Sequence, residues 1–216
     1  MSYLVHQESL CTYCQFPNEV EVWSIVNVNT DPELRDLLLG GELNMAECAS
    51  CKQIFYAEHF MLYHDPDYEL MAFVYPHEHA DERPQWERKT AEDFARTQAE
   101  TPEDKKLAYS PVTLFGLDQL IYFVEHEEEK AIQGEIASLL APAHGFLTRK
   151  LKPSEAREKN VPTVIPYLND QEGLVRTSVL AALEKLRAVN DRLFVYAKLE
   201  ETLRQNPNWT FEKCPR

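Results

Sequence analysis

Long apolar runs are absent from the sequence, and this absence limits the classes of protein to consider. No stretch approaches the ~20 consecutive apolar residues that a helix needs to cross a bilayer, so we expect no membrane-spanning segment. Residues 1–8 also lack the basic region and long apolar stretch of a secretory signal. We therefore expect a cytoplasmic protein, in which thiols stay reduced and cysteines act as metal ligands or catalysts rather than as disulfides.

Basic side chains are scarce at the start of the chain. Residues 1–76 contain only Arg35 and Lys52 against twelve Asp and Glu, so they hold −10 of the formal net charge of −14. Non-specific binding to nucleic acid depends on cationic side chains that displace counterions, so this acidity disfavours a nucleic-acid partner. One basic stretch occurs later in the chain and keeps nucleic-acid binding open as an alternative; it contains Arg149, Lys150, Lys152, Arg157 and Lys159.

Common catalytic signatures are missing too. The sequence contains no HExxH, GxSxG, P-loop or GxGxxG pattern, which removes the commonest hydrolase and nucleotide-binding sites. Four histidines nevertheless lie close together in the sequence, namely His59, His64, His77 and His79. They indicate a second metal site or an enzyme site. The alternative that we favour is that they are surface and turn residues, with His64 and Asp65 bonded to the backbone of the Asp65–Pro66 turn.

Apolar periodicity divides the chain into a strand-rich and a helix-rich part. Alternation and turn residues predict strands over 3–10, 18–28, 43–48, 53–63 and 69–75. A short helix is predicted over 31–39, capped by Thr30 or Asp31 and ended by a left-handed Gly40. Apolar spacings of three and four predict helix from 117 to 140 and from 170 to 205, the latter as one helix or as two separated near Asn190.

These elements predict an α+β protein in three segments. Residues 1–76 should form an antiparallel zinc-ribbon-like sheet with the inserted short helix, residues 77–111 a charged connector, and residues 112–216 a mostly helical region packed on the sheet. The packing is inferred from strand 69–75, which is apolar on both faces and so must be covered on both.

Two Cys-x-x-Cys pairs carry the clearest chemical signal in the sequence. Cys11 and Cys14 form one pair, Cys48 and Cys51 the other, and 33 residues separate them. Zn²⁺ prefers tetrahedral thiolate coordination, and each such turn delivers two sulfurs from one tight loop. We expect one Zn²⁺ per chain on these four residues, because a redox dithiol would open a helix whereas both pairs lie between strands. Two alternatives are four buried core cysteines and a redox pair, and Cys214 is expected to be an unpaired tail residue.

The N-terminal part also resembles a known family. The segments that carry the resemblance are Cys11–Cys14, Val22-Trp23 with Val26–Val28, Asp31–Arg35, Leu37–Leu43, Cys48–Cys51 and Leu62–Asp65. The resemblance is to the CpXC-domain family, over roughly residues 8–76 and more weakly at Phe115–Asp118. The resemblance implies a ribbon-like sheet and zinc binding, but no established activity. This chain has Thr12 and Ala49 where the family usually has proline, and Gln15 and Lys52 where such turns often have glycine.

The function expected from the sequence is that of a zinc-binding cytosolic protein without enzymatic activity that acts as a protein-interaction module. An acidic ribbon attached to a helical platform suits a protein partner. The alternatives are a nucleic-acid-binding zinc ribbon, and an enzyme that uses the region of His59, His64, His77 and His79. Partner identity and oligomeric state are not predicted.

Overall fold

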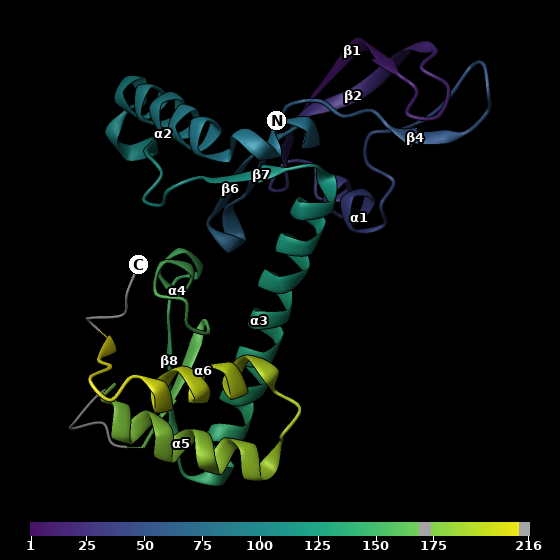
Figure 1. Cartoon of the computed structure of the whole chain (residues 1–216). Helices are drawn as coiled ribbons and strands as arrows, with labels where there is room; N and C mark the ends of the chain where they lie inside the picture. The colour runs from purple at the N-terminus through teal and green to yellow at the C-terminus, as the bar shows by residue number, and fades with distance from the viewer. Residues whose placement is uncertain (169–173, 212–216) are drawn as a thin grey trace. The chain divides into compact units, whose positions relative to one another are not determined.

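The computed structural model describes residues 1–168 and 174–211 and divides into two compact units, Met1–Glu125 and His126–Arg216 (Figure 1). The predicted segment 77–111 lies inside the first unit. Cys214 lies outside the described residues. No helix in the described ranges combines the length and apolarity needed to span a membrane.

The first unit contains a five-stranded sheet in the order β1-β2-β5-β6-β7 and a separate pair, β3-β4. Its elements are β1 (Tyr3–Leu10), β2 (Pro17–Asn27), α1 (Glu33–Leu39), β3 (Met45–Glu47), β4 (Ile54–Tyr56), β5 (Met61–Asp65), η1 (Pro66–Tyr68), β6 (Leu70–Tyr75), η2 (His77–Glu82), α2 (Arg83–Glu100), η3 (Glu103–Lys105), β7 (Val112–Phe115) and the start of α3 (Leu117–His144).

The α+β class predicted from the sequence is confirmed, but the predicted antiparallel arrangement is wrong for the main sheet, which is mixed. β2 pairs with β5, and β6 with β7, in parallel, while β1 with β2 and β5 with β6 are antiparallel. A parallel pair needs a long crossover between its strands. Here α1 and the β3-β4 hairpin connect β2 to β5, and α2 connects β6 to β7. The predicted strand 53–63 is therefore divided between β4 and β5.

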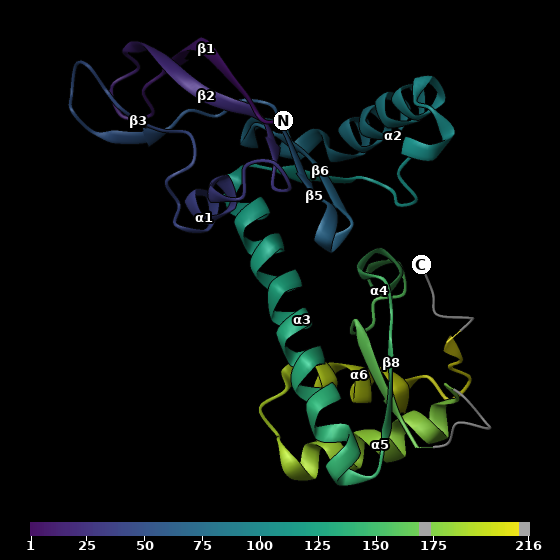
Figure 2. The ribbon, with the colours of Figure 1, turned by 180° about the vertical axis from the view of Figure 1, so that it is seen from behind.

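Strand β6 is covered on both faces, as its sequence predicted. Leu70, Ala72 and Val74 are buried in a core that includes α1 and the first turns of α3. On the other face, the Tyr75 ring lies 4.5 Å from that of Trp86 in α2. Figures 1 and 2 show where α2, β6 and α3 run.

The ends of α1 differ in detail from the prediction. Gly40 is right-handed, with φ −70°, and the left-handed residue is Gly41, with φ +70°. Asp31 makes no side-chain cap to α1. Its carboxylate instead accepts hydrogen bonds from the Ser2 amide and the Thr30 hydroxyl, and the bonds from these two residues lower its pKa to about 2.

The second unit has its own hydrophobic core, which includes eighteen buried residues among those described. It contains the rest of α3, β8 (Leu147–Lys150), α4 (Pro153–Glu158), β9 (Val164–Tyr167), α5 (Arg176–Val189) and α6 (Phe194–Gln205). The two-helix alternative for the C-terminal segment is thus confirmed, with the break starting at Asn190. Buried Glu127 pairs with Arg157 at 2.7 Å, so the basic stretch of the sequence is partly neutralised within this unit.

Candidate metal centre

The two Cys-x-x-Cys turns have the same backbone structure. In the first, the Cys11 amide donates to the carbonyl of Phe16 at 3.0 Å, and the Gln15 amide donates to the Cys11 carbonyl at 2.9 Å. In the second turn, the Cys48 amide donates to the carbonyl of Gln53 at 2.9 Å, and the Lys52 amide donates to the Cys48 carbonyl at 3.0 Å. β1 and β2 lead into and out of the first turn, and β3 and β4 do the same for the second. Each hairpin thereby presents two thiols on one side of a tight loop.

The residue after each pair adopts the left-handed conformation. Gln15 has φ 59° and Lys52 has φ 61°. A side chain in this conformation is strained relative to glycine, which explains why glycine is favoured in such turns. Gln15 gains a local bond, because its Nε2 donates to the Cys11 carbonyl at 3.2 Å. The absence of the two usual prolines and glycines therefore leaves the turn geometry intact.

The four thiols meet at one point. Sγ of Cys11 lies 3.7 Å from that of Cys51, Sγ of Cys14 lies 3.6 Å from that of Cys48, and all four lie within 4.8 Å of one another. A tetrahedral Zn²⁺ with Zn–S bonds of about 2.3 Å holds its sulfurs about 3.8 Å apart. The spacing of the thiols therefore fits a metal ion in their centre.

Electrostatics in the cluster also favour a bound cation. Burial opposes ionisation of the Cys48 thiol. Backbone hydrogen bonds from Cys51 and Ser50, and the neighbouring thiols, outweigh this effect of burial and lower the pKa of Cys48 to about 6. At Cys51 the backbone bond from Gln53 favours the thiolate, yet burial and the three adjacent thiols raise its pKa to about 12. Four thiolates side by side repel one another, and a divalent cation removes this repulsion.

A second layer of contacts supports the thiols. The buried side chain of Asn18 donates to Sγ of Cys48 at 3.8 Å and to the Phe16 carbonyl at 2.7 Å, and it accepts the Ala49 amide at 2.8 Å. Asn18 was not predicted from the sequence, because an asparagine at the start of a strand has no distinctive local pattern. The remaining packing is a small apolar cluster whose buried members are Cys11, Val22, Cys48, Phe55 and Ala57.

The four histidines do not assemble into a site. His64 hydrogen-bonds the Tyr109 hydroxyl at 3.0 Å, and the His79 ring stacks on Trp86 at 4.3 Å. The His77 amide donates to Glu58. Among the described residues, the four cysteines are the only group of three or more His, Cys, Asp or Glu that is placed to share a metal ion.

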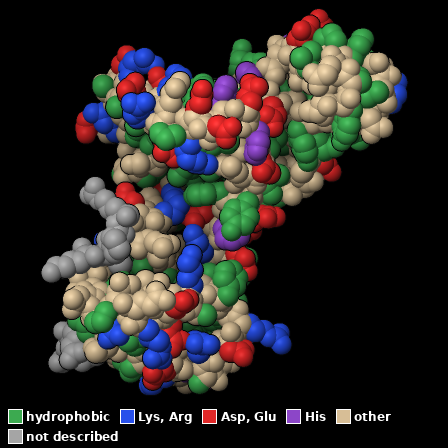
Figure 3. Space-filling model, in the orientation of Figure 1, with side chains coloured by type: hydrophobic (Ala, Val, Ile, Leu, Met, Phe, Trp, Pro, Cys, Tyr) green, Lys and Arg blue, Asp and Glu red, His purple; other side chains and the backbone are tan. Residues whose placement is uncertain are grey.

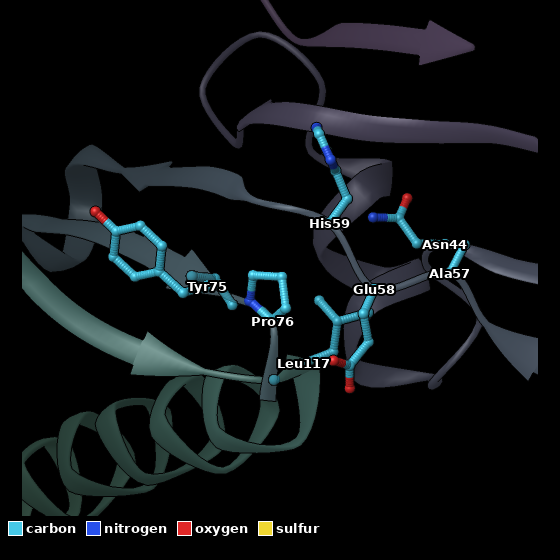
Figure 4. A pocket seen from close by; sticks show the side chains of 9 residues that line it. Asn44, Ala57, Glu58, His59, Tyr75, Pro76 and Leu117 are labelled. Atoms are coloured by element: carbon cyan, nitrogen blue, oxygen red, sulfur yellow. The ribbon is translucent and has the colours of Figure 1, made fainter. Parts of the chain in front are cut away.

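His59 lines a small cavity, shown in Figure 4, together with Asn44, Glu58, Tyr75, Pro76 and Leu117. The cavity measures about 10 Å³, which is room for about one water molecule and no substrate. Partial burial lowers the pKa of His59, and burial likewise lowers that of His64. Neither histidine is therefore held in its charged form by its surroundings.

Comparison with known families matches residues 10–132 to the CpXC protein family, which is more than half of the chain. The chain belongs to the CpXC family. The match is longer than the resemblance over 8–76 had suggested, and it takes in α2, β7 and the first half of α3. The CpXC region thus includes the whole five-stranded sheet except most of β1. Neither the curated proteins nor the solved structures contain a match to this chain.

Proposed function

We propose that the CpXC region binds one Zn²⁺ through Cys11, Cys14, Cys48 and Cys51, and that this ion is structural. The sulfur-to-sulfur spacing is the observation that supports the proposal. Four protein thiolates leave no open position for water or substrate, which is typical of structural rather than catalytic zinc. The pair of cysteine hairpins then corresponds to a zinc ribbon.

The metal is tested by elemental analysis of the full chain. We expect about one zinc per chain, and a sharp fall in Cys48→Ser, because three thiols leave the shell incomplete. Ser50→Ala is the matched control: it lies in the same turn and offers no ligand, so its zinc content should equal that of the wild type. A folded wild-type protein without zinc, or a Cys48→Ser variant with full zinc content, would contradict the proposal.

We further propose that the zinc-stabilised region is a module that binds another protein. The surroundings of its few cations support a protein over a nucleic acid. Arg35 is largely buried beside Asp65 at 3.6 Å, and Lys52 lies 3.5 Å from Glu47. Both basic side chains of residues 1–76 thus face carboxylates, and the surrounding surface is acidic.

Three of the five cations in the basic stretch of the second unit also have contacts within their own unit. Arg149 and Lys159 lie over the ring of Phe211 at 5.2 and 4.8 Å, and Arg157 pairs with Glu127. Fluorescence anisotropy with labelled DNA and RNA at physiological salt tests the choice between partners. We expect no appreciable binding, because few cations are available to displace counterions. Tight binding that weakens steeply with salt would instead support a nucleic-acid partner.

A further inference from the structure

The β1-β2 hairpin has an outer face that is unusually apolar at one end. Along β2 the even positions Val22 and Val26 are fully buried, while the odd positions face outward, as strand alternation requires. Outward positions of a half-exposed strand are normally polar. Here they include Trp23, which is half-buried against the core of the unit, and Ile25, which is 36% exposed.

A groove lies beside this apolar end. Leu4 of β1 is paired with Trp23 of β2, and both line the groove together with Leu37 of α1 and Met45 of β3. Its volume is about 270 Å³. Leu4, Leu37 and Met45 are 37%, 38% and 39% exposed, so apolar side chains form its walls at the surface. Figure 3 shows hydrophobic side chains at the surface of the part of the first unit formed by β1, β2 and β4.

The middle of the same face is acidic. Glu8 and Glu19 are directly opposite each other on β1 and β2, and both are exposed. Like charges at directly opposed positions destabilise a strand pair. Glu21, whose carboxylate lies 3.3 Å from Nε2 of the opposed His6, continues this row toward the groove, which it also lines with Glu42. A nearby cation from another molecule would remove the repulsion between Glu8 and Glu19.

We propose that this face of the hairpin is the docking surface for a segment of a partner protein that carries an apolar or aromatic anchor followed by Lys or Arg. The anchor occupies the groove beside Trp23, and the basic side chains lie along Glu8, Glu19 and Glu21. The assignment rests on the protein-interaction module proposed above and specifies its partner. Charge complementarity favours a basic segment, since residues 1–76 carry twelve acidic and two basic side chains.

The test uses the full, zinc-loaded chain as bait for a random peptide library displayed on phage. We expect enrichment of peptides with an apolar or aromatic residue close to Lys or Arg. A synthetic copy of an enriched peptide should bind at least about tenfold more weakly to Leu37→Glu and to Glu19→Lys, because each removes a central contact. Glu92→Lys on α2 and Leu139→Glu on α3 are matched controls at other exposed positions, and they should bind the peptide as the wild type does.

Zinc content and the melting profile of each variant show that it is folded. The inference is overturned if no peptide of the expected type is enriched, or if the peptide binds folded Leu37→Glu and Glu19→Lys as tightly as the wild type. If a peptide binds both variants as tightly as the wild type, the protein still acts as an interaction module, but its docking surface lies elsewhere. Nucleic-acid binding in the anisotropy experiment would instead overturn the proposed function itself.

Discussion

Asn18 connects the two cysteine hairpins through Cys48: its side-chain amide donates to Sγ of Cys48 across 30 positions of sequence. The same amide accepts the backbone N–H of Ala49, so one side chain orients both a thiol and the turn that carries it. A hydrogen bond to sulfur stabilises the thiolate form that a metal requires. With the proposed ion bound, the ion and the amide would together hold the hairpins in register.

We expect Asn18→Leu to lower zinc affinity by about 10- to 100-fold, the range typical of lost outer contacts to a metal ligand. Competition with a chromophoric chelator measures this affinity. Asn29→Ala is the matched control at an exposed asparagine and should bind zinc as the wild type does. An unchanged zinc affinity in folded Asn18→Leu would show that the Asn18 side chain does not support the metal site.

Metal removal should affect the two units differently. The cluster around the cysteines has five buried members, two of which are the proposed ligands Cys11 and Cys48. The second unit has eighteen buried members among its described residues and includes none of the cysteine pairs. Because structural zinc contributes on the order of 10 kcal/mol near neutral pH, its loss should unfold the hairpins first.

Hydrogen exchange with and without excess chelator tests this difference. We expect faster exchange across β1 to β4 after zinc removal and nearly unchanged protection in α5 and α6. The Cys48→Ser variant should show the same pattern without chelator. Uniform loss of protection along the described chain would mean that the second unit depends on the metal as well.

Replacing the left-handed residue of the second cysteine turn, Lys52, by glycine should stabilise the protein. Lys52→Gly removes the strain of a side chain at φ 61° and should raise the stability of the first unit by about 0.5–1 kcal/mol. Urea unfolding of the zinc-loaded protein measures this gain. Lys52→Ala keeps the strain and removes only the exposed ion pair with Glu47, so it should be near wild type. A Gly variant no more stable than the Ala variant would contradict the argument.

Glu200 should give the second unit a defined acid sensitivity. Hydrogen bonds from Arg187 and then Arg204 lower the pKa of this buried carboxyl below its ordinary value of 4.5. The unfolded chain therefore binds a proton more readily, so the stabilisation is present above about pH 4.5 and is lost as the pH falls through the folded pKa.

We expect Glu200→Gln to cost about 1–2 kcal/mol at pH 7, because it loses charge-assisted hydrogen bonds. Thermal melts from pH 7 to pH 3 should show the difference from wild type shrinking in the acid range. The neighbouring variant Glu201→Gln, at an exposed position, should change little at any pH. A difference independent of pH would assign the effect to packing rather than to charge.

The sequence by itself determined the features that depend on short spacing. The α+β class and the double cover of β6 follow from apolar periodicity and turn residues within a few positions of each other, whereas one helix or two over residues 170–205 stayed open. The cysteine set follows from ligand chemistry, because two residues between cysteines place both thiols on one side of a turn. Local information did not fix single positions, because the left-handed glycine was predicted at Gly40 and lies at Gly41.

Only the tertiary structure decided which distant segments meet. The parallel pairing of β2 with β5 and of β6 with β7 depends on crossovers whose paths have no local signature. The contact between Asn18 and Cys48 and the burial of Arg35 beside Asp65 likewise join residues 30 positions apart. Such partners are selected by the packing of the whole unit, since many distant pairings satisfy the same local pattern and only one fills the core.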